Sequence, residues 1–383
     1  MFLEIPFKYQ ADCRQLRTLL PKMLFEDLPA ETVTQIFLHA PTVSSALSLS
    51  STCHYFRKIY TSSKKLIILS QAVETQYGPL HDAIQLVTHN TSQPAHIVRS
   101  APLSEALVRS VVQVGRTATR WEELYPFKKW KSDFQNRRLL TDNERYLVRR
   151  ALYRLWLFTR AFHSRAYPRT LRGTTESMRE RAALLHNFST DELSEMLDVH
   201  NILRDTVGSN VCPSNGTIRR KFQKRHPESN YQLLFNIHLN YPPPSSFVPS
   251  GYYHSSANME SKFHNKFTPS RHHEPGAEGW GDDILHYYVV EDMLKLDPEQ
   301  ILYLKDNCPY KAQVEGFTQN LGEWFTNNGE TFCQTLGHVI YQRGGEMEEL
   351  REAVRDGEAG VTIGDFAGNT DEHEDVAIRC CGV

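Results

Sequence analysis

The first apolar positions of the chain recur at helical spacing. The pattern i, i+3, i+4 and i+7, typical of one helix face, is occupied by Val33, Ile36, Phe37 and Ala40. Pro41 ends that helix, because the residue before a proline disfavours the α conformation. Two more apolar faces follow, at Val43, Ala46, Leu47 and Leu49, and at Cys53, Phe56, Ile59 and Tyr60. The pattern predicts three short helices.

Such a unit is small for an independent domain. Three helices in about forty residues bury too little apolar surface to be secure alone. A partner, or the domain that follows, must therefore cover the second apolar side. Pro29 suits the first turn of the first helix, and Glu31 would meet the positive end of the helix dipole. These features indicate a docking module.

Helical patterns continue along the rest of the chain. Capping boxes at residues 141–144 and 189–192 each precede an apolar face at helical spacing. Residues 297–300 combine an N-cap acid, a proline in the first turn and a glutamine at the third position. The only strand-like run is residues 65–69, and no internal repeat period is present. We therefore expect an all-α protein.

Composition shifts divide the chain into five segments, two of which are helical regions. The sequence leaves open whether these two regions form one domain or two. In chain order the five segments are a compact unit at 20–65, a basic helical domain at 66–240, a loop or linker rich in Pro, His and Ser at 241–281, an acidic helical region at 282–355 and an acidic, disordered tail at 356–383.

Net charge is close to zero, at −2, but the charges are unevenly distributed. Residues 116–172 carry 15 Lys and Arg against 5 Asp and Glu, whereas residues 274–300 carry 8 acids against one base. Residues 345–383 carry 11 acids against 3 bases. Because large surfaces of one sign are usually avoided, we expect the acidic helical region to pack on the basic one.

The segment from residue 28 to residue 57 resembles an F-box. The resemblance is carried in order by Leu28, Pro29, Glu31, Ile36, Phe37, Leu47, Leu49, Cys53, Phe56 and Arg57. Ala40 and Ala46 stand where the family usually has leucine, and Thr52 replaces the usual valine. The run from 144 to 156 is also similar to fungal F-box proteins that lack recognisable leucine-rich, WD40 or kelch repeats.

This resemblance implies a fold and two sets of residues. The fold is an N-terminal three-helix F-box followed by an irregular helical domain. Contacts with the Skp adaptor would come from Leu28 and Pro29, with Val43 and Leu47 near the interface. The F-box core would consist of Val33, Ile36, Phe37, Leu49, Cys53, Phe56 and Ile59.

The same resemblance implies a substrate-recognition adaptor of an SCF-type cullin–RING ubiquitin ligase, present in the cytoplasm or nucleus. Its partners would be the Skp adaptor, the cullin and an unknown protein substrate. Two alternatives are a scaffold or regulatory protein that acts outside ubiquitin transfer, and an enzyme with an unrecognised helical active site. A cluster of buried ionisable residues in a deep pocket would favour the enzyme.

Two basic clusters are candidate binding sites. Arg145, Arg149, Arg150 and Arg154 lie on one predicted helix. They either pair with acids such as Asp282, Asp283, Glu291 or Asp292, or form a groove for an acidic or phosphorylated substrate segment. The second cluster consists of Arg219, Arg220, Lys221, Lys224 and Arg225. We interpret it as either a nuclear import signal or a solvated helix face.

Other chemistry finds little support in the pattern. The 7 cysteines include no C-x-x-C pair, which argues against a disulfide framework and a structural zinc site. No apolar run resembles a secretory signal or a membrane span, and no nucleic-acid-binding fold or catalytic motif is recognisable. We expect no cofactor, no metal and no catalytic residue. Four histidines lie shortly before Glu274, and we interpret them as loop histidines: His254, His264, His272 and His273.

Overall fold

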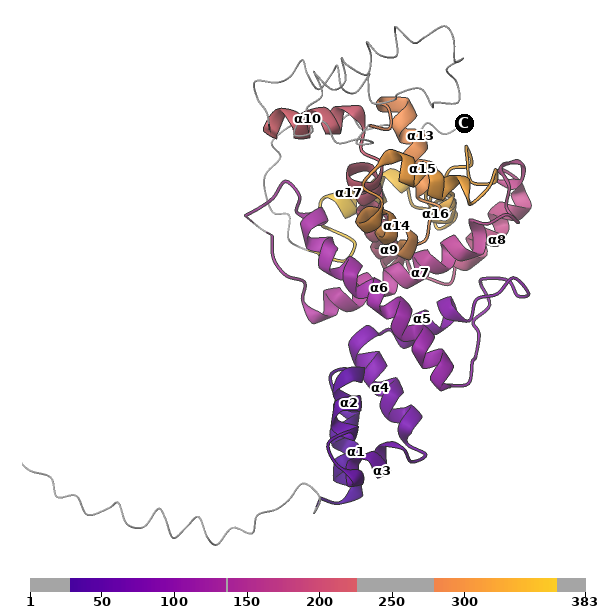
Figure 1. Ribbon diagram of the computed structural model, residues 1–383. Coiled ribbons are helices and arrows are strands. Elements are labelled where there is room, and N and C mark those ends of the chain that lie inside the picture. Colours follow the sequence, from indigo (N-terminus) through magenta and orange to yellow (C-terminus); the bar gives the residue numbers. More distant parts are fainter. Residues whose placement is uncertain (1–27, 136, 226–278, 364–383) are drawn as a thin grey trace, which may run out of the picture. The chain divides into compact units, whose positions relative to one another are not determined.

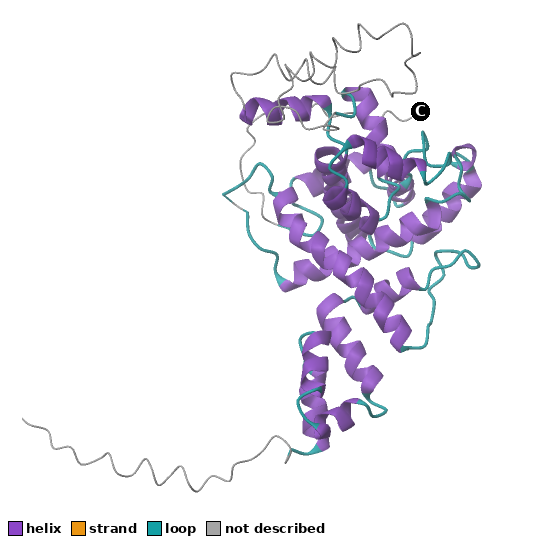
Figure 2. Cartoon of the chain, viewed as in Figure 1, coloured by secondary structure: helices purple, strands orange, loops and turns teal. Residues whose placement is uncertain are grey.

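The computed structural model describes residues 28–135, 137–225 and 279–363 (Figure 1). Within these ranges every regular element is helical and no strand occurs, which confirms the predicted all-α class (Figure 2). No helix in the described ranges combines the length and apolar character that crossing a bilayer requires.

The chain divides into two compact units. The first comprises residues 1–76 and 102–109, and the second comprises residues 77–101 and 110–383. The described helices of the first unit are α1 (Ala30–Leu38), α2 (Val43–Ser50), α3 (His54–Tyr60) and α4 (Lys65–Tyr77), joined by the start of α6 (Glu105–Lys129).

Local signals place the first three helices where the sequence predicts them. The Thr42 side chain accepts a hydrogen bond from the Ser45 amide at 2.9 Å and so caps α2. Cys53 caps α3 in the same way, with its sulfur 3.5 Å from the Phe56 amide nitrogen. In the core, the Phe37 ring lies 6.2 Å from the ring of Phe56. Aromatic packing therefore joins α1 to α3.

The strand-like run at residues 65–69 is helical and belongs to α4. The buried residues Ile68, Leu69, Ala72 and Val73 follow one another at helical spacing. A short apolar run is compatible with both a strand and a buried helix. Here the apolar positions after the run have helical spacing and so indicate a helix. The first unit consequently continues past the boundary at residue 65 that the sequence predicts.

The second unit is built around α7, which packs on both α5 and α9 (Figure 1). From Ala151 to Phe158 every residue of α7 is buried, so the helix runs through the core. Besides α6, the helices of this unit are α5 (Leu80–Val87), α7 (Asp142–Phe162), η3 (Arg169–Leu171), α8 (Thr175–Leu185), α9 (Thr190–Thr206), η4 (Val207–Val211), α10 (Asn215–Arg225), α13 (Asp283–Met293), α14 (Pro298–Asn307), α15 (Lys311–Gln319), α16 (Phe332–Gln342) and α17 (Met347–Arg355).

Three predicted helix starts are confirmed. Thr141, Ser189 and Asp297 each form a complete capping box at the beginning of α7, α9 and α14. Helices from the acidic region at 282–355 pack on the basic one, with α16 against α8 and α17 against α9. The capping signals therefore position the elements that carry the sites described below.

The predicted disordered tail begins with packed residues. Val361 is 2% exposed and Thr362 is fully buried, so the prediction is wrong for this part of the tail. Gly360 explains the difference, because its φ of +106° favours glycine and a Cβ there would lie 2.8 Å from Asp198 Oδ2. The backbone can thus approach the buried Asp198 closely. The rest of the tail and the predicted loop up to residue 278 lie outside the described residues.

Candidate functional site

The predicted adaptor-binding residues lie at the start of α1 and along α2. Pro29 is exposed, Leu28 and Val43 are half-buried, and the Leu47 side chain is 46% exposed. The Tyr55 hydroxyl donates a hydrogen bond of 2.7 Å to the Leu28 carbonyl oxygen, which ties the beginning of α1 to α3. The first unit therefore presents apolar side chains on short helices, of which α2 and α3 begin with a side-chain cap.

Most predicted core residues of this unit are buried. Val33, Phe37, Phe56 and Ile59 are all at most 9% exposed. Leu49 is half-buried, and Cys53 is the cap of α3 described above. The prediction is wrong for one position.

That position is Ile36, whose side chain is 39% exposed. Successive residues of a helix are turned by about 100°, so Ile36 lies well off the face that Val33 and Phe37 bury. A spacing pattern fixes the centre of an apolar face better than its edges.

The basic residues of α7 do not form an open groove. Arg149 Nη1 lies 3.0 Å from Glu122 Oε2, and Arg149 Nε donates a hydrogen bond of 2.9 Å to the Gly78 carbonyl. Arg145 Nε lies 3.6 Å from the other oxygen of Glu122. Burial raises the pKa of the Glu122 carboxyl, and the two guanidinium groups oppose that rise. Both arginines are therefore engaged with α6.

Arg150 and Arg154, the other two arginines of the predicted groove, are held by acids as well. Arg150 makes two hydrogen bonds to the Glu195 carboxylate, at 2.5 and 3.1 Å. Arg154 is 7% exposed and lies 3.0 Å from Asp82 and 2.8 Å from Glu192. Each of the four arginines of the predicted groove therefore lies beside an acid. These pairs favour the other interpretation, in which the arginines of α7 pair with acids.

The prediction of which acids pair with those arginines was wrong. Glu291 pairs with Arg204, and Asp292 lies 3.0 Å from Lys295. Asp282 accepts a hydrogen bond from the Gly216 amide, and Asp283 begins α13. The acids that hold α7 come instead from α5, α6 and α9, which share its core.

The second basic cluster lies on α10. Arg219, Arg220, Lys221 and Lys224 are all exposed, and Lys221 Nζ donates a hydrogen bond of 2.9 Å to the Ser209 carbonyl. The side chain of Arg225 and the four loop histidines lie outside the described residues. The exposed residues fit both a solvated helix face and an import signal.

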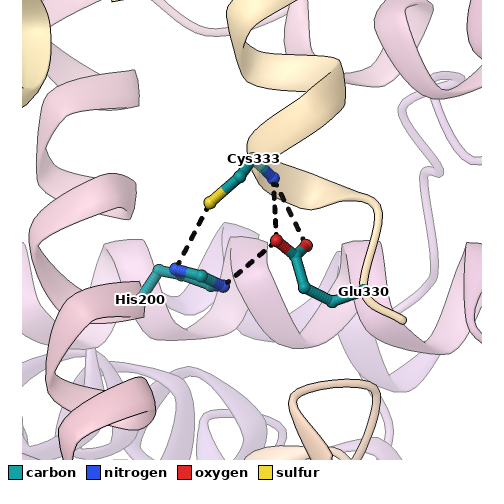
Figure 3. Close-up of side chains that lie close together, drawn as sticks. All are labelled: His200, Glu330 and Cys333. Carbon is teal, nitrogen blue, oxygen red and sulfur yellow. Dashed lines mark hydrogen bonds and ion pairs between the residues drawn. The ribbon is translucent and has the colours of Figure 1, made fainter. Parts of the chain in front are cut away.

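A cluster that the sequence did not indicate lies inside the second unit (Figure 3). It joins His200 of α9 to Glu330, which precedes α16, and to Cys333, the second residue of α16. The Cys333 sulfur lies 3.7 Å from His200 Nδ1, and Glu330 Oε1 lies 3.9 Å from His200 Nε2. His200 and Glu330 are 4% and 3% exposed.

The start of α16 fixes two members of this cluster. Glu330 Oε2 accepts hydrogen bonds from the amides of Phe332 and Cys333 and so acts as the cap of the helix. The Glu330 amide in turn donates to the Glu291 carbonyl at 2.9 Å. The carboxylate is thereby held beside the thiol.

Burial sets the charges of the three side chains. It lowers the pKa of His200 to about 4 and raises the pKa of the Cys333 thiol well above its ordinary value. Burial alone would raise the pKa of Glu330, yet the neighbouring His200 and Arg204 hold it below its ordinary value. At neutral pH the cluster therefore contains a neutral imidazole, a thiol and a carboxylate.

A thiol, an imidazole and a carboxylate in this order resemble the relay of a cysteine nucleophile. A nucleophile needs an open path to substrate. Two described cavities reach residues beside Glu330, one of about 310 Å³ lined by Glu291 and Gly329 and a smaller one lined by Gly329 and Thr331, and neither is lined by any of the three members. The arrangement supplies metal-ligand atoms more readily than a reaction site.

Sequence reasoning missed this cluster because His200 and Cys333 are 133 positions apart. The only local sign of the cluster in the sequence was the position of Glu330, three residues before Cys333 at the start of a helix. No protein-family model, curated protein or solved structure matches this chain.

Proposed function

We propose that the chain is a substrate-recognition adaptor of an SCF-type ubiquitin ligase, and that its first unit is an F-box. The observation that carries the proposal is the exposure of apolar side chains on a very small helical unit. Pro29 is exposed, Ile36 is 39% exposed and Leu47 is 46% exposed.

The geometry of α1 supports a docking surface. Pro29 and Ile36 are seven positions apart, which is about two helical turns, so they lie on the same side of the helix. Neither side chain belongs to the buried face that holds Phe37. A partner that covers such side chains removes apolar surface from water, at about 1.5–3 kcal/mol for each large one.

The proposed division of labour follows from the two units. The first unit would hold the Skp adaptor, and through it the cullin, while the second would hold the protein substrate. Bringing the substrate near the transferase raises its effective concentration, and the adaptor itself would carry out no reaction.

The test is co-expression of the full chain with the Skp adaptor, followed by size-exclusion chromatography. We expect a stable complex in which Leu28→Ala, Pro29→Ala or Leu47→Ala each weakens binding by about 1–3 kcal/mol, roughly 5- to 150-fold in Kd. Tyr341→Ala is the matched control, since this apolar side chain is 79% exposed on α16 in the second unit.

The outcomes separate the proposal from its alternatives. A complex that also retains the cullin supports a ligase adaptor, whereas a Skp complex that excludes the cullin would favour a scaffold. No complex from a folded chain, or equal binding by all four variants, would contradict the assignment of this surface.

A further inference from the structure

We propose that His200, Glu330 and Cys333 form a binding site for a divalent transition-metal ion, with zinc the best match. This inference is independent of the adaptor proposal, because it concerns only the interior of the second unit. It rests on the donor atoms, their spacing and an unsatisfied nitrogen (Figure 3).

The donor set suits zinc. Imidazole nitrogen, thiolate sulfur and carboxylate oxygen are its usual protein ligands, at about 2.0–2.3 Å. One such atom from each side chain lies within 4.8 Å of the other two. Ligand atoms around a tetrahedral ion are roughly 3.3–3.8 Å apart, from those bond lengths. The measured 3.7 Å between the Cys333 sulfur and His200 Nδ1 falls within that range.

The unsatisfied nitrogen is a second and independent observation. His200 Nε2 has no hydrogen-bond partner among the described residues, although the side chain is buried and directed at Glu330. Such a buried polar atom normally costs about 1–3 kcal/mol. Its separation of 3.9 Å from Glu330 Oε1 is too long for a hydrogen bond. Two metal–ligand bonds of about 2.0–2.2 Å at a tetrahedral angle place their donors about 3.3–3.6 Å apart, so this pair would have to close by about 0.5 Å.

The two ring nitrogens define how far the site must adjust. The thiol faces Nδ1 and the carboxylate faces Nε2, whereas a metal binds one nitrogen (Figure 3). If the ion binds Nδ1, the Glu330 carboxylate must therefore move toward Nδ1. If the ion binds Nε2, the Cys333 sulfur must move toward Nε2. Since no pair of donor atoms is more than 4.8 Å apart, closing to tetrahedral separations requires shifts of about 1 Å.

Charges of both signs surround the cluster. The carboxylates of Glu291 and Glu330 lie near Arg204, which pairs with Glu291, and near Arg172, while Arg351 lies near His200. A metal ion that binds the thiolate would displace the Cys333 proton and so place a negative charge next to the ion. Arg172 and Arg181 donate hydrogen bonds to the Glu330 carbonyl and the Thr335 hydroxyl.

The start of α16 also supplies the outer shell that metal ligands require. Amide donors from Phe332 and Cys333 orient the Glu330 carboxylate and leave lone pairs for an ion. The described residues offer three donors, so a water molecule would complete the coordination. An ion bound there would tie α9 to α16 and stabilise the fold.

Cobalt and zinc are the probes for the full chain. Purified metal-free protein is titrated with Co²⁺, and the thiolate-to-cobalt charge-transfer absorption is recorded. We expect one ion per chain with that absorption, and a higher Tm after zinc is added. Cys333→Ser should abolish both signals, while Cys308→Ser, which changes another partly exposed thiol, should retain both.

A second variant guards against misfolding of the first. His200→Gln keeps the thiol and should weaken zinc binding at least about tenfold, because one of three ligands is lost. Circular dichroism checks that each variant retains its helices. No charge-transfer absorption in the unmodified chain, or absorption and a Tm shift that persist in Cys333→Ser, would overturn the proposal.

Discussion

Removing the carboxylate of Asp198 should destabilise the second unit strongly. Asp198 is 1% exposed and accepts hydrogen bonds from Lys129 Nζ at 2.8 Å, the Tyr125 hydroxyl at 2.5 Å and the Val361 amide at 3.1 Å. The Lys129 side chain is itself only 8% exposed. Three donors from two distant parts of the chain therefore meet on one buried carboxylate.

The expected magnitude follows from the cost of a broken buried ion pair. Asp198→Ala leaves the Lys129 ammonium without its carboxylate and with the Val354 carbonyl as an acceptor, which costs about 3–5 kcal/mol, and deprives two neutral donors of a partner. Asp198→Asn keeps an oxygen acceptor and removes only the charge, so it should lower the free energy of unfolding by less. Because domains are stable by only about 5–15 kcal/mol, the alanine variant should approach unfolding at 37 °C.

The assay is urea unfolding at 25 °C followed by tryptophan fluorescence. A double-mutant cycle with Lys129→Met isolates the pair, and we expect the double variant Asp198→Ala/Lys129→Met to be more stable than Asp198→Ala alone. A loss below about 1 kcal/mol for Asp198→Ala would refute the reasoning, because it would mean that the ammonium finds water instead.

Three further outcomes are expected. Phe37→Ala should destabilise the first unit by about 3–5 kcal/mol in thermal unfolding, since the ring is fully buried, and a loss typical of a surface residue would argue against a folded core there. Gly360→Val should lower Tm because a Cβ would meet Asp198 Oδ2 at 2.8 Å, whereas Gly173→Val, with nothing within 4 Å, is its control. Burial lowers the pKa of Lys295 from 10.5 to about 8, so between these values the unfolded chain binds more protons and stability rises with pH. The stability of the unmodified chain relative to Lys295→Met should therefore increase from pH 8 to pH 10.5, and a constant difference would contradict the shift.

Sequence reasoning was most successful where the signal is local. A capping box needs only four residues, and those at Thr141, Ser189 and Asp297 begin helices as predicted. The strand-like run of α4 was ambiguous because four consecutive apolar residues carry no period, and only the buried Ala72 and Val73 beyond it show the helix.

Partners of buried charges could not be read from the sequence. Arg154 lies against Asp82, which is 72 positions away, and nothing in the local pattern selects that acid over the many others. The same reason hid the pairing of His200 with Cys333. Which acid meets which base depends on how the helices pack, and helix packing follows from side-chain shapes that periodicity does not describe.

The contact of Val361 with Asp198 has a consequence for folding during synthesis. The two residues are 163 positions apart, so ribosomes working at about 5–20 residues per second need about 10–30 s to deliver the second after the first. During that interval the carboxylate lacks one of its donors, and the surface that Val361 covers stays open. We therefore expect the nascent second unit to remain sensitive to proteases, and a substrate for chaperones, until residue 362 leaves the exit tunnel.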